Sequence, residues 1–241
     1  GRNVSNSDPN NRITRFHHND ISEYMLQDND GGGFYMIEDG AFLRIDHNYV
    51  HDTKGYINAG IYFDWSKNYI CDHNIVDNTW STFHLQKTWK DEKVSNLLIY
   101  NNTAICKNID YGSGPFNFSG ADVKDGSVFK NNIALLLTPP DAPLYQTYQQ
   151  FSSRYANVIM SNNFDNGDHP DAAHFVDYAG NDFQLTSASV NLIDQGVLFE
   201  TYTRAGVTVS PYNDPITGSA PDIGALEYGL PAFKVGASDT T

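Results

Sequence analysis

Cysteines and long apolar stretches, which mark disulfide-rich and membrane-spanning proteins, are scarce in this sequence. Its 241 residues hold two cysteines and no stretch of about 18 consecutive apolar residues, so the chain offers no membrane-spanning helix. Cys71 and Cys106 both lie in strand-like runs. We expect two buried free thiols there, and a disulfide between them is the alternative.

Cationic residues are also few. Lys and Arg number 15 against 29 Asp and Glu, which gives a formal net charge of −14. Binding to nucleic acid or to an anionic membrane needs a basic surface, so this balance argues against both partners. It argues only weakly against a polyanionic glycan, because a local basic patch can outweigh the overall charge.

The first residues, Gly1-Arg2-Asn3-Val4, have none of the features of a signal peptide. We expect either a secreted, periplasmic or cell-surface bacterial protein whose signal has been removed, or a fragment of a longer enzyme. In the second case, the N-terminal part of the same enzyme is a partner of this chain.

Asn, Asp, Gly and Tyr are abundant, a mixture typical of short strands joined by polar turns. Six segments share a pattern in which a strand-like run is followed by His or Asn, then by Asn, then by an apolar residue within two positions. That Asn stands at 19, 48, 74, 102, 132 and 163, so successive repeats are 29, 26, 28, 30 and 31 residues apart. A repeat of this length fits a solenoid coil of two or three strands.

We therefore predict an all-β fold, a right-handed parallel β-helix of about six coils over residues 1–174. Residues 175–241 are expected to form a terminal strand and a C-terminal cap over the open end of the solenoid. The repeated Asn tolerates the left-handed conformation of a sharp corner, and its amide can bond to the same corner of the next coil. His18, His47 and His73 share this corner, so we expect structural roles for them and no metal site.

Two segments, residues 28–36 and 58–65, interrupt the repeat with glycine, aspartate and tyrosine. Alternation along a strand directs Tyr35, Tyr62 and Asp64 outward. Asp30 precedes the first strand and Asp64 ends the second, so the two carboxylates are expected to face each other across a groove. The glycines before Phe34 would let the backbone approach a ligand closely.

This arrangement suits cleavage of a glycosidic bond, in which one carboxyl group is the general acid and the other is the nucleophile or base. The aromatic candidates for stacking on sugar rings are Tyr35, Tyr62, Trp65 and Trp80. His51 and His84 are candidates for contacting sugar hydroxyls or orienting a carboxylate.

The same residues allow other interpretations. Asp-Gly-Gly is a common turn, and Asp64 can cap the corner that follows it. Asp28 and Asp30, with Glu38 or Asp39, would offer oxygen ligands to a structural calcium ion, although their spacing is not that of an EF-hand. Apart from this alternative, we expect no metal and no cofactor.

Four motifs follow one another in the first half of the chain: Asp-Gly-Gly-Gly-Phe-Tyr at 30–35, Asn-Tyr-Val-His-Asp at 48–52, Gly-Ile-Tyr-Phe-Asp at 60–64 and Phe-His at 83–84. In order and spacing they resemble the β-helix enzymes of glycoside hydrolase family 141, which include α-L-fucosidase and xylanase activities. The resemblance implies a glycoside hydrolase that acts on a plant or algal polysaccharide, with Asp30 and Asp64 as the catalytic pair. The chain departs from the family's pattern at Gly33, Phe34 and Trp65.

Two other classes of function stay open. A polysaccharide lyase needs a Lys or Arg base and must neutralise a uronate carboxylate, and Lys54, Lys87 and Lys90 lie near the same loops. A non-catalytic glycan-binding β-helix would keep the aromatic side chains and have replaceable aspartates. The loop from Thr138 to Arg154 either covers the groove or packs beside the solenoid.

Overall fold

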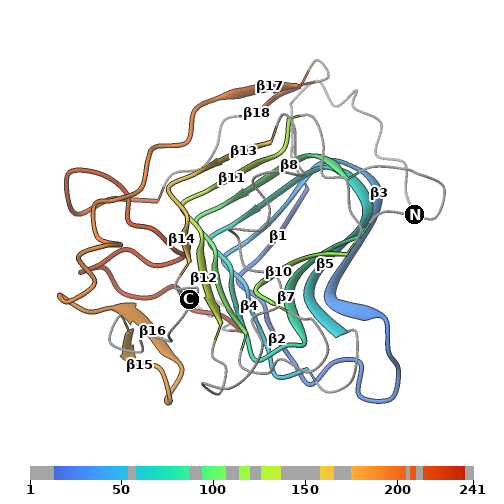
Figure 1. The fold of residues 1–241 in the computed structure, drawn as a ribbon, viewed down its shortest axis with the longest axis horizontal. Helices are drawn as coiled ribbons and strands as arrows, with labels where there is room; N and C mark the ends of the chain where they lie inside the picture. The colour runs from blue at the N-terminus through green and yellow to red at the C-terminus, as the bar shows by residue number, and fades with distance from the viewer. Residues whose placement is uncertain are drawn as a thin grey trace, which may run out of the picture.

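The computed structural model describes residues 14–53, 58–86, 94–106, 114–119, 126–136, 158–165, 175–204, 207–209 and 214–236. Every regular element within these residues is a β-strand, and no helix long and apolar enough to cross a membrane occurs among them. Parallel strands wind around a solenoid with three faces (Figure 1). The predicted fold class, an all-β parallel β-helix, is confirmed.

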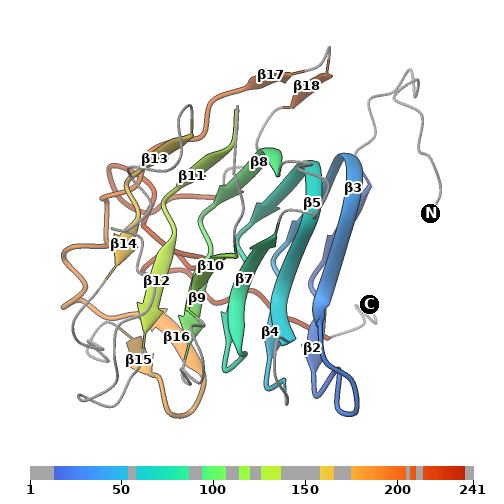
Figure 2. The same cartoon turned by 45° about the vertical axis from the view of Figure 1, so that its right-hand side comes forward.

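The strands of each face follow one another along the solenoid (Figure 2). The first face holds the initial halves of β3 (Gly31–Asp46) and β5 (Asn58–Asp72), then β7 (Ser81–Gln86) and β10 (Phe116–Ser119). The second face holds β1 (Arg15–His17), the final halves of β3 and β5, β8 (Ser95–Tyr100), β11 (Val128–Lys130) and β13 (Ile159–Ser161). The third face holds β2 (Asp20–Ser22), β4 (Tyr49–His51), β6 (Ile75–Asp77), β9 (Thr103–Cys106), β12 (Ile133–Leu136) and β14 (Phe164–Asp165).

Six coils contribute to the second and third faces, and four strands form the first face among the described residues. The predicted count of about six coils therefore holds for two faces, whereas complete three-sided turns number four. Two antiparallel pairs follow: β15 (Phe175–Asp177) with β16 (Asp182–Leu185), and β17 (Tyr202–Arg204) with β18 (Val207–Val209). The predicted boundary between residues 174 and 175 adjoins residues 166–174, and these lie outside the described residues.

At the corner between the second and third faces, two neighbouring residues share the role that the sequence assigned to one asparagine. The first of each pair adopts positive φ, for example 51° at His47 and 50° at Asn101. The second is always Asn, and its Nδ2 donates to Oδ1 of the same Asn in the next coil at 2.8–3.0 Å. The predicted ladder is present, and the left-handed residue is the one that precedes each ladder Asn.

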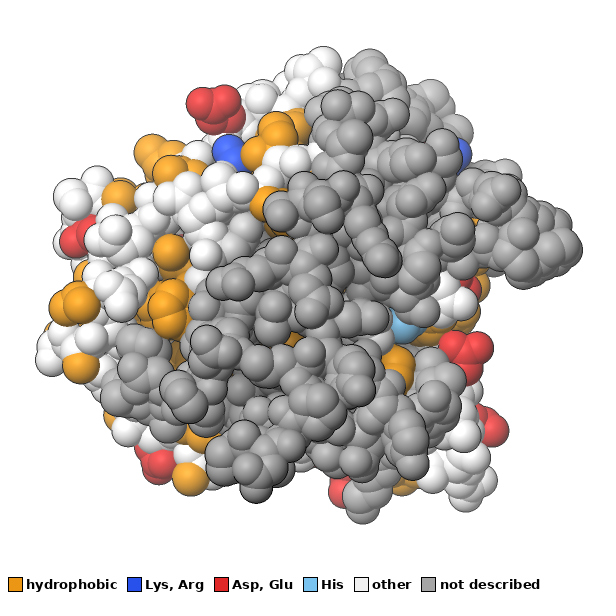
Figure 3. Space-filling view, in the orientation of Figure 1, with side chains coloured by type: hydrophobic (Ala, Val, Ile, Leu, Met, Phe, Trp, Pro, Cys, Tyr) orange, Lys and Arg blue, Asp and Glu red, His pale blue; other side chains and the backbone are white. Residues whose placement is uncertain are grey.

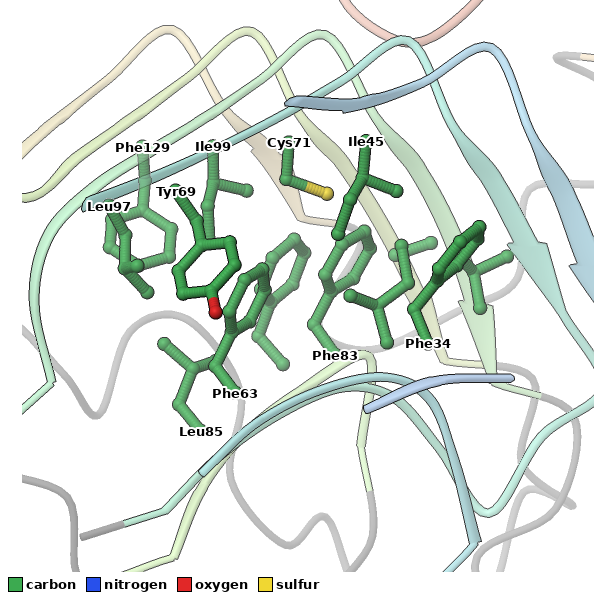
Figure 4. Packing of buried hydrophobic residues seen from close by; sticks show 14 of the residues in the cluster. Phe34, Ile45, Phe63, Tyr69, Cys71, Phe83, Leu85, Leu97, Ile99 and Phe129 are labelled. Carbon is green, nitrogen blue, oxygen red and sulfur yellow. The ribbon is translucent and has the colours of Figure 1, made fainter. Parts of the chain in front are cut away.

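Apolar side chains from the three faces fill the interior of the solenoid (Figure 4). The rings of Phe83 and Phe116 stack with centroids 4.6 Å apart, and Phe34 lies on the same row in the first coil. Each such side chain contributes about 1.5–3 kcal/mol through burial. Cys71 and Cys106 are buried free thiols, as predicted.

The described residues of the C-terminal segment, 175–204, 207–209 and 214–236, lie along the outside of the solenoid (Figure 1). Outward side chains of the third face, including Ile105 and Leu135, pack against Phe183, Leu192 and other residues of this segment. On the second face, Phe199 stacks on Tyr100 with centroids 3.9 Å apart. The described residues of this segment thus cover apolar outward side chains of two faces, and the predicted cap over the open end stays a prediction.

The histidines at the ladder corner form a stacked column. Ring centroids are 5.2 Å apart between His18 and His47 and 5.0 Å apart between His47 and His73. His47 Nδ1 lies 2.8 Å from Asp46 Oδ2, and His47 Nε2 lies 2.8 Å from Oδ2 of Asp214 in the C-terminal segment. The column thus ties that segment to the solenoid, in keeping with the structural role that the sequence predicted.

Substitution of a central ladder residue should weaken the whole stack. In Asn74→Ala, the backbone N–H and Nδ2 of Asn48 lose their buried acceptor, so the free energy of unfolding should fall by about 3 kcal/mol. Asn163→Ala removes the last rung, where the contacts are only partly buried, and should cost less. Chemical denaturation measures the free energy of unfolding of both variants. Equal losses in the two would contradict the view that the buried rungs hold the stack together.

The stability of the fold should decrease at alkaline pH through His47. Burial alone lowers the pKa of His47, but the bonds to Asp214 and Asp46 outweigh it and raise the pKa to about 9. A group whose pKa is raised by folding stabilises fully below its unfolded pKa near 6.5, and that stability is lost as the pH rises through 9.

We therefore expect the free energy of unfolding to drop by roughly 3 kcal/mol between about pH 6 and pH 9.5. Denaturation curves across this range, compared with those of His47→Gln, measure the effect. A variant that keeps the full slope would show that another group is responsible.

Candidate functional site

The outer surface of the first face differs chemically from the other two. Several outward positions of the second face, such as Ile70 and Leu98, are apolar and pack in one cluster with Phe199 of the C-terminal segment, beside the ion pair of Arg44 and Asp72. Outward positions of the first face carry tyrosine, histidine, amide and carboxylate groups instead. Within the described residues, acidic side chains lie at separate places around the rim of the molecule, and basic ones are sparse (Figure 3). Among them Tyr35 is exposed, whereas the side chains of Tyr62 and His84 are buried.

Backbone register aligns the outward side chains of the first face in two rows. Tyr35, Tyr62, His84 and Asn117 are successive partners in the first row. The second row consists of Ile37, Asp64 and Gln86. The predicted alternation is confirmed, because Phe34, Ile61 and Phe63 between them point into the core.

Two tyrosines connect Asp30 and Asp64. Tyr35 Oη donates to Asp64 Oδ2 at 2.8 Å, and Tyr62 Oη lies 3.4 Å from Asp30 Oδ1. The two rings lie beside each other with centroids 4.7 Å apart. Asp30 has a φ of 66° and immediately precedes β3, so a sharp turn sets its position. The two carboxylates lie on one side of the molecule; with Tyr35 and Tyr62 we call them the tyrosine–carboxylate cluster.

Burial and the nearby charge of Asp30 raise the pKa of Asp64, while hydrogen bonds from Tyr35 and Trp65 partly offset that rise. Burial also raises the pKa of both Tyr35 and Tyr62, and the neighbouring carboxylates raise it further. Both hydroxyls therefore keep their protons at neutral pH and act as donors. The cluster holds one carboxyl group that accepts a proton more readily than an ordinary aspartate.

Gln86 belongs to this site, and the sequence analysis missed it. Its Oε1 accepts a hydrogen bond from Tyr62 Oη and lies 3.2 Å from His84 Nε2. The signal was present in the repeat: residues 82–86 occupy the same register as the Gly-Ile-Tyr-Phe-Asp motif at 60–64. Superposing the two coils places Gln86 beside Asp64, with an amide in place of the acid.

His84 is 2% exposed, and burial lowers its pKa to about 4. The ring is therefore uncharged at neutral pH. Because the Gln86 oxygen can only accept, His84 carries its proton on Nε2, and its buried Nδ1 has no hydrogen-bond partner. Trp80 lies against the same ring, with centroids 5.6 Å apart.

The other predicted site residues are distributed differently. Trp65 follows Asp64 at a corner with a φ of 45° and bonds to its carboxylate, so it belongs to the site. His51 points outward from the third face, where it bonds to Asp20 and Asp52, and the structure does not bring it to the cluster.

Packing accounts for the glycines before Phe34. A side chain at Gly31 would meet Met25, and one at Gly33 would meet Val50. Close packing therefore explains these glycines without the ligand that the sequence analysis expected them to admit. Lys54, Lys87, Lys90 and the loop from Thr138 to Arg154 lie outside the described residues.

In the described part of the chain, one group of His and Asp side chains brings potential metal-ligating atoms within 4.8 Å of one another: His47, Asp72 and His73. Asp72 is already ion-paired with Arg44, which competes with a cation at that position. The acidic residues named for a calcium ion, Asp28, Asp30, Glu38 and Asp39, do not form such a group. Asp39 instead lies 3.9 Å from Lys67.

Comparison with known proteins adds one structural likeness. No family model matches the chain, and no curated protein matches it. Among solved structures, a pectate lyase, Pel9A, is similar, with a TM-score of 0.49 and 20% sequence identity. The likeness covers 89% of this chain and 51% of the pectate lyase, so the chain spans about half the length of that structure. It concerns the course of the backbone and says nothing about which residues act.

Removal of one hydroxyl should change the titration of Asp64. The Tyr35 hydrogen bond lowers the pKa of Asp64, so Tyr35→Phe should raise that pKa further. A ¹³C NMR titration of the aspartate carboxyl carbons measures it, and Tyr228→Phe in the C-terminal segment is the matched control. An unchanged or lowered pKa of Asp64 in Tyr35→Phe would show that this hydrogen bond does not form in solution.

Proposed function

We propose that the chain is a glycoside hydrolase that cleaves a plant or algal polysaccharide, outside the cytoplasm, at the tyrosine–carboxylate cluster. The observation that carries this proposal is the pair of carboxylates on one outer face, each beside the hydroxyl of one of two neighbouring tyrosines. Glycosidic cleavage needs two such groups, one to protonate the leaving oxygen and one to attack the sugar or activate water.

The two aspartates have unequal surroundings, which supports a division of roles. Burial and the charge of Asp30 raise the pKa of Asp64, so we assign Asp64 as the general acid. Asp30 is then the nucleophile or the general base. Tyr35 orients the Asp64 carboxyl group, and Tyr62 connects Asp30 with Gln86.

Aromatic side chains beside the carboxylates would bind the sugar. Tyr35 is 41% exposed and Ile37, in the adjacent row, is also exposed, so both can contact the apolar face of a pyranose ring. Trp65 bonds to the Asp64 carboxylate, and the ring of Trp80 lies beside that of His84. The four motifs that resemble glycoside hydrolase family 141 favour the same assignment.

Two substitutions test the proposal. Asp30→Asn and Asp64→Asn should each lower the release of reducing sugar by about a thousandfold. Each substitution removes a carboxyl group that donates a proton, accepts a proton or attacks the sugar. Glu38→Gln, which changes an exposed carboxylate on the same coil, should keep full activity. Affinity electrophoresis should show that all three variants still bind the glycan.

The products separate this function from its alternatives. A hydrolase releases saturated sugars, whereas a polysaccharide lyase releases unsaturated products that absorb in the ultraviolet. Ultraviolet-absorbing products would favour the lyase. Glycan binding without turnover in the wild-type chain would favour a non-catalytic glycan-binding β-helix.

A further inference from the structure

The hydroxyl group of Tyr62 has one proton and two neighbouring acceptors. Gln86 Oε1 is in direct hydrogen-bond contact with Tyr62 Oη, whereas Asp30 Oδ1 lies 3.4 Å from it. An O–H···O bond normally spans about 2.5–3.0 Å, so the proton points to Gln86 and a lone pair of the Tyr62 oxygen faces Asp30. Tyr35 treats the other carboxylate in the opposite way, because its proton points to Asp64 Oδ2 at 2.8 Å.

The orientation of the Gln86 amide decides where the Tyr62 proton points. The amide oxygen also lies 3.2 Å from Nε2 of His84, a residue that is 2% exposed. With the oxygen there, His84 holds its proton on Nε2 and leaves a bare acceptor at the buried Nδ1. The reversed amide would move that proton to Nδ1 and bury an N–H group without an acceptor, which is the rarer arrangement in proteins. The environment of His84 therefore favours an amide that accepts from Tyr62.

Gln86 supplies this acceptor without adding a charge. It occupies in β7 the position that Asp64 occupies in β5. A carboxylate at that position would place a third negative charge near Asp30 and Asp64, and like charges make each carboxyl group harder to ionise. An amide orients the Tyr62 hydroxyl and leaves the number of charges in the cluster unchanged.

From this arrangement we infer that Gln86 is a positioning residue, which holds the Tyr62 proton away from Asp30 so that Asp30 acts as the nucleophile or base. The inference rests on the proposed function of the same site. A hydrogen bond donated to a carboxylate stabilises its charged form and weakens it as a base. Tyr62 would donate such a bond to Asp30 if Gln86 did not hold its hydroxyl.

Two measurements without substrate test the hydrogen bond itself. In a crystal structure of Gln86→Leu, the acceptor left beside Tyr62 among the described residues is Asp30, so the distance from Tyr62 Oη to Asp30 Oδ1 should shorten from 3.4 Å to about 2.7 Å. In the wild-type chain, ¹⁵N NMR should show that His84 carries its proton on Nε2. A short bond from Tyr62 to Asp30 in a wild-type crystal, or a proton on Nδ1 of His84, would overturn the inference.

The pH profile of sugar release tests the consequence for the reaction. Gln86→Leu should lower kcat about tenfold with little change in KM, and should move the acidic limb of the profile to lower pH by about one unit. Gln86→Glu keeps the acceptor and adds a charge, so both limbs should move to higher pH. Gln195→Leu, at an exposed position of the C-terminal segment, is the matched control and should leave the profile unchanged.

A second substitution separates the contribution of Tyr62 from that of its neighbours. Within the described residues, the titratable groups that interact electrostatically with Asp30 are Tyr35, Tyr62, Asp64 and His84. Burial raises the pKa of both tyrosines and lowers that of His84 to about 4, so His84 also titrates on the acidic side. Adding Tyr62→Phe to Gln86→Leu removes the redirected hydroxyl and keeps His84, so the acidic limb should return close to its wild-type position.

An acidic limb that does not move in Gln86→Leu, or that stays shifted after Tyr62→Phe is added, would contradict a positioning role. So would shifts in the same direction in Gln86→Leu and Gln86→Glu, because these variants change the acceptor and the charge separately. Failure of the proposed function looks different. If the wild-type chain cleaves no polymer, that function is removed, and the crystal structures and the His84 proton still decide to which group Tyr62 donates.

Discussion

The asparagine ladder is the interaction on which the rest of the structure depends. Each ladder Asn accepts hydrogen bonds from the backbone N–H and side-chain amide of the coil before it, for example Asn74 from Asn48. These bonds fix the axial register of the coils, and a parallel sheet with fixed register places equivalent side chains in rows. Tyr35, Tyr62 and His84 lie side by side for that reason, although they come from three different coils.

The three faces of one solenoid differ because something else packs on two of them. The C-terminal segment needs apolar partners, and the outward residues of the second and third faces provide them. The outward side chains of the first face, such as Tyr35, Tyr62 and His84, are absent from the apolar clusters that this segment forms, although Tyr62 and His84 are buried. The position of the candidate site therefore follows from the path of the C-terminal segment as much as from the site residues.

Charge is handled in opposite ways at the ladder corner and at the candidate site. At the corner, Asp46 lies within reach of Arg15 and His47, and these partners hold the pKa of Asp46 well below its usual range despite burial. At the site, Asp64 has Asp30 and neutral donors as neighbours, and its pKa moves upward. Paired buried charge stabilises the attachment of the C-terminal segment, and carboxylates without a described cationic partner are available for chemistry.

The sequence by itself determined the solenoid, because a repeat of Asn with near-constant spacing and alternating apolar residues admits few other folds, and it determined the outward direction of Tyr35 and Asp64. It could not place His51, since the same alternation that turns this side chain outward does not say which of three faces it occupies. It also missed Gln86, whose role arises from contact with the preceding coil. Those two outcomes, and the path of the C-terminal segment, were decided by tertiary structure, because they depend on which surfaces pack against each other across long stretches of chain.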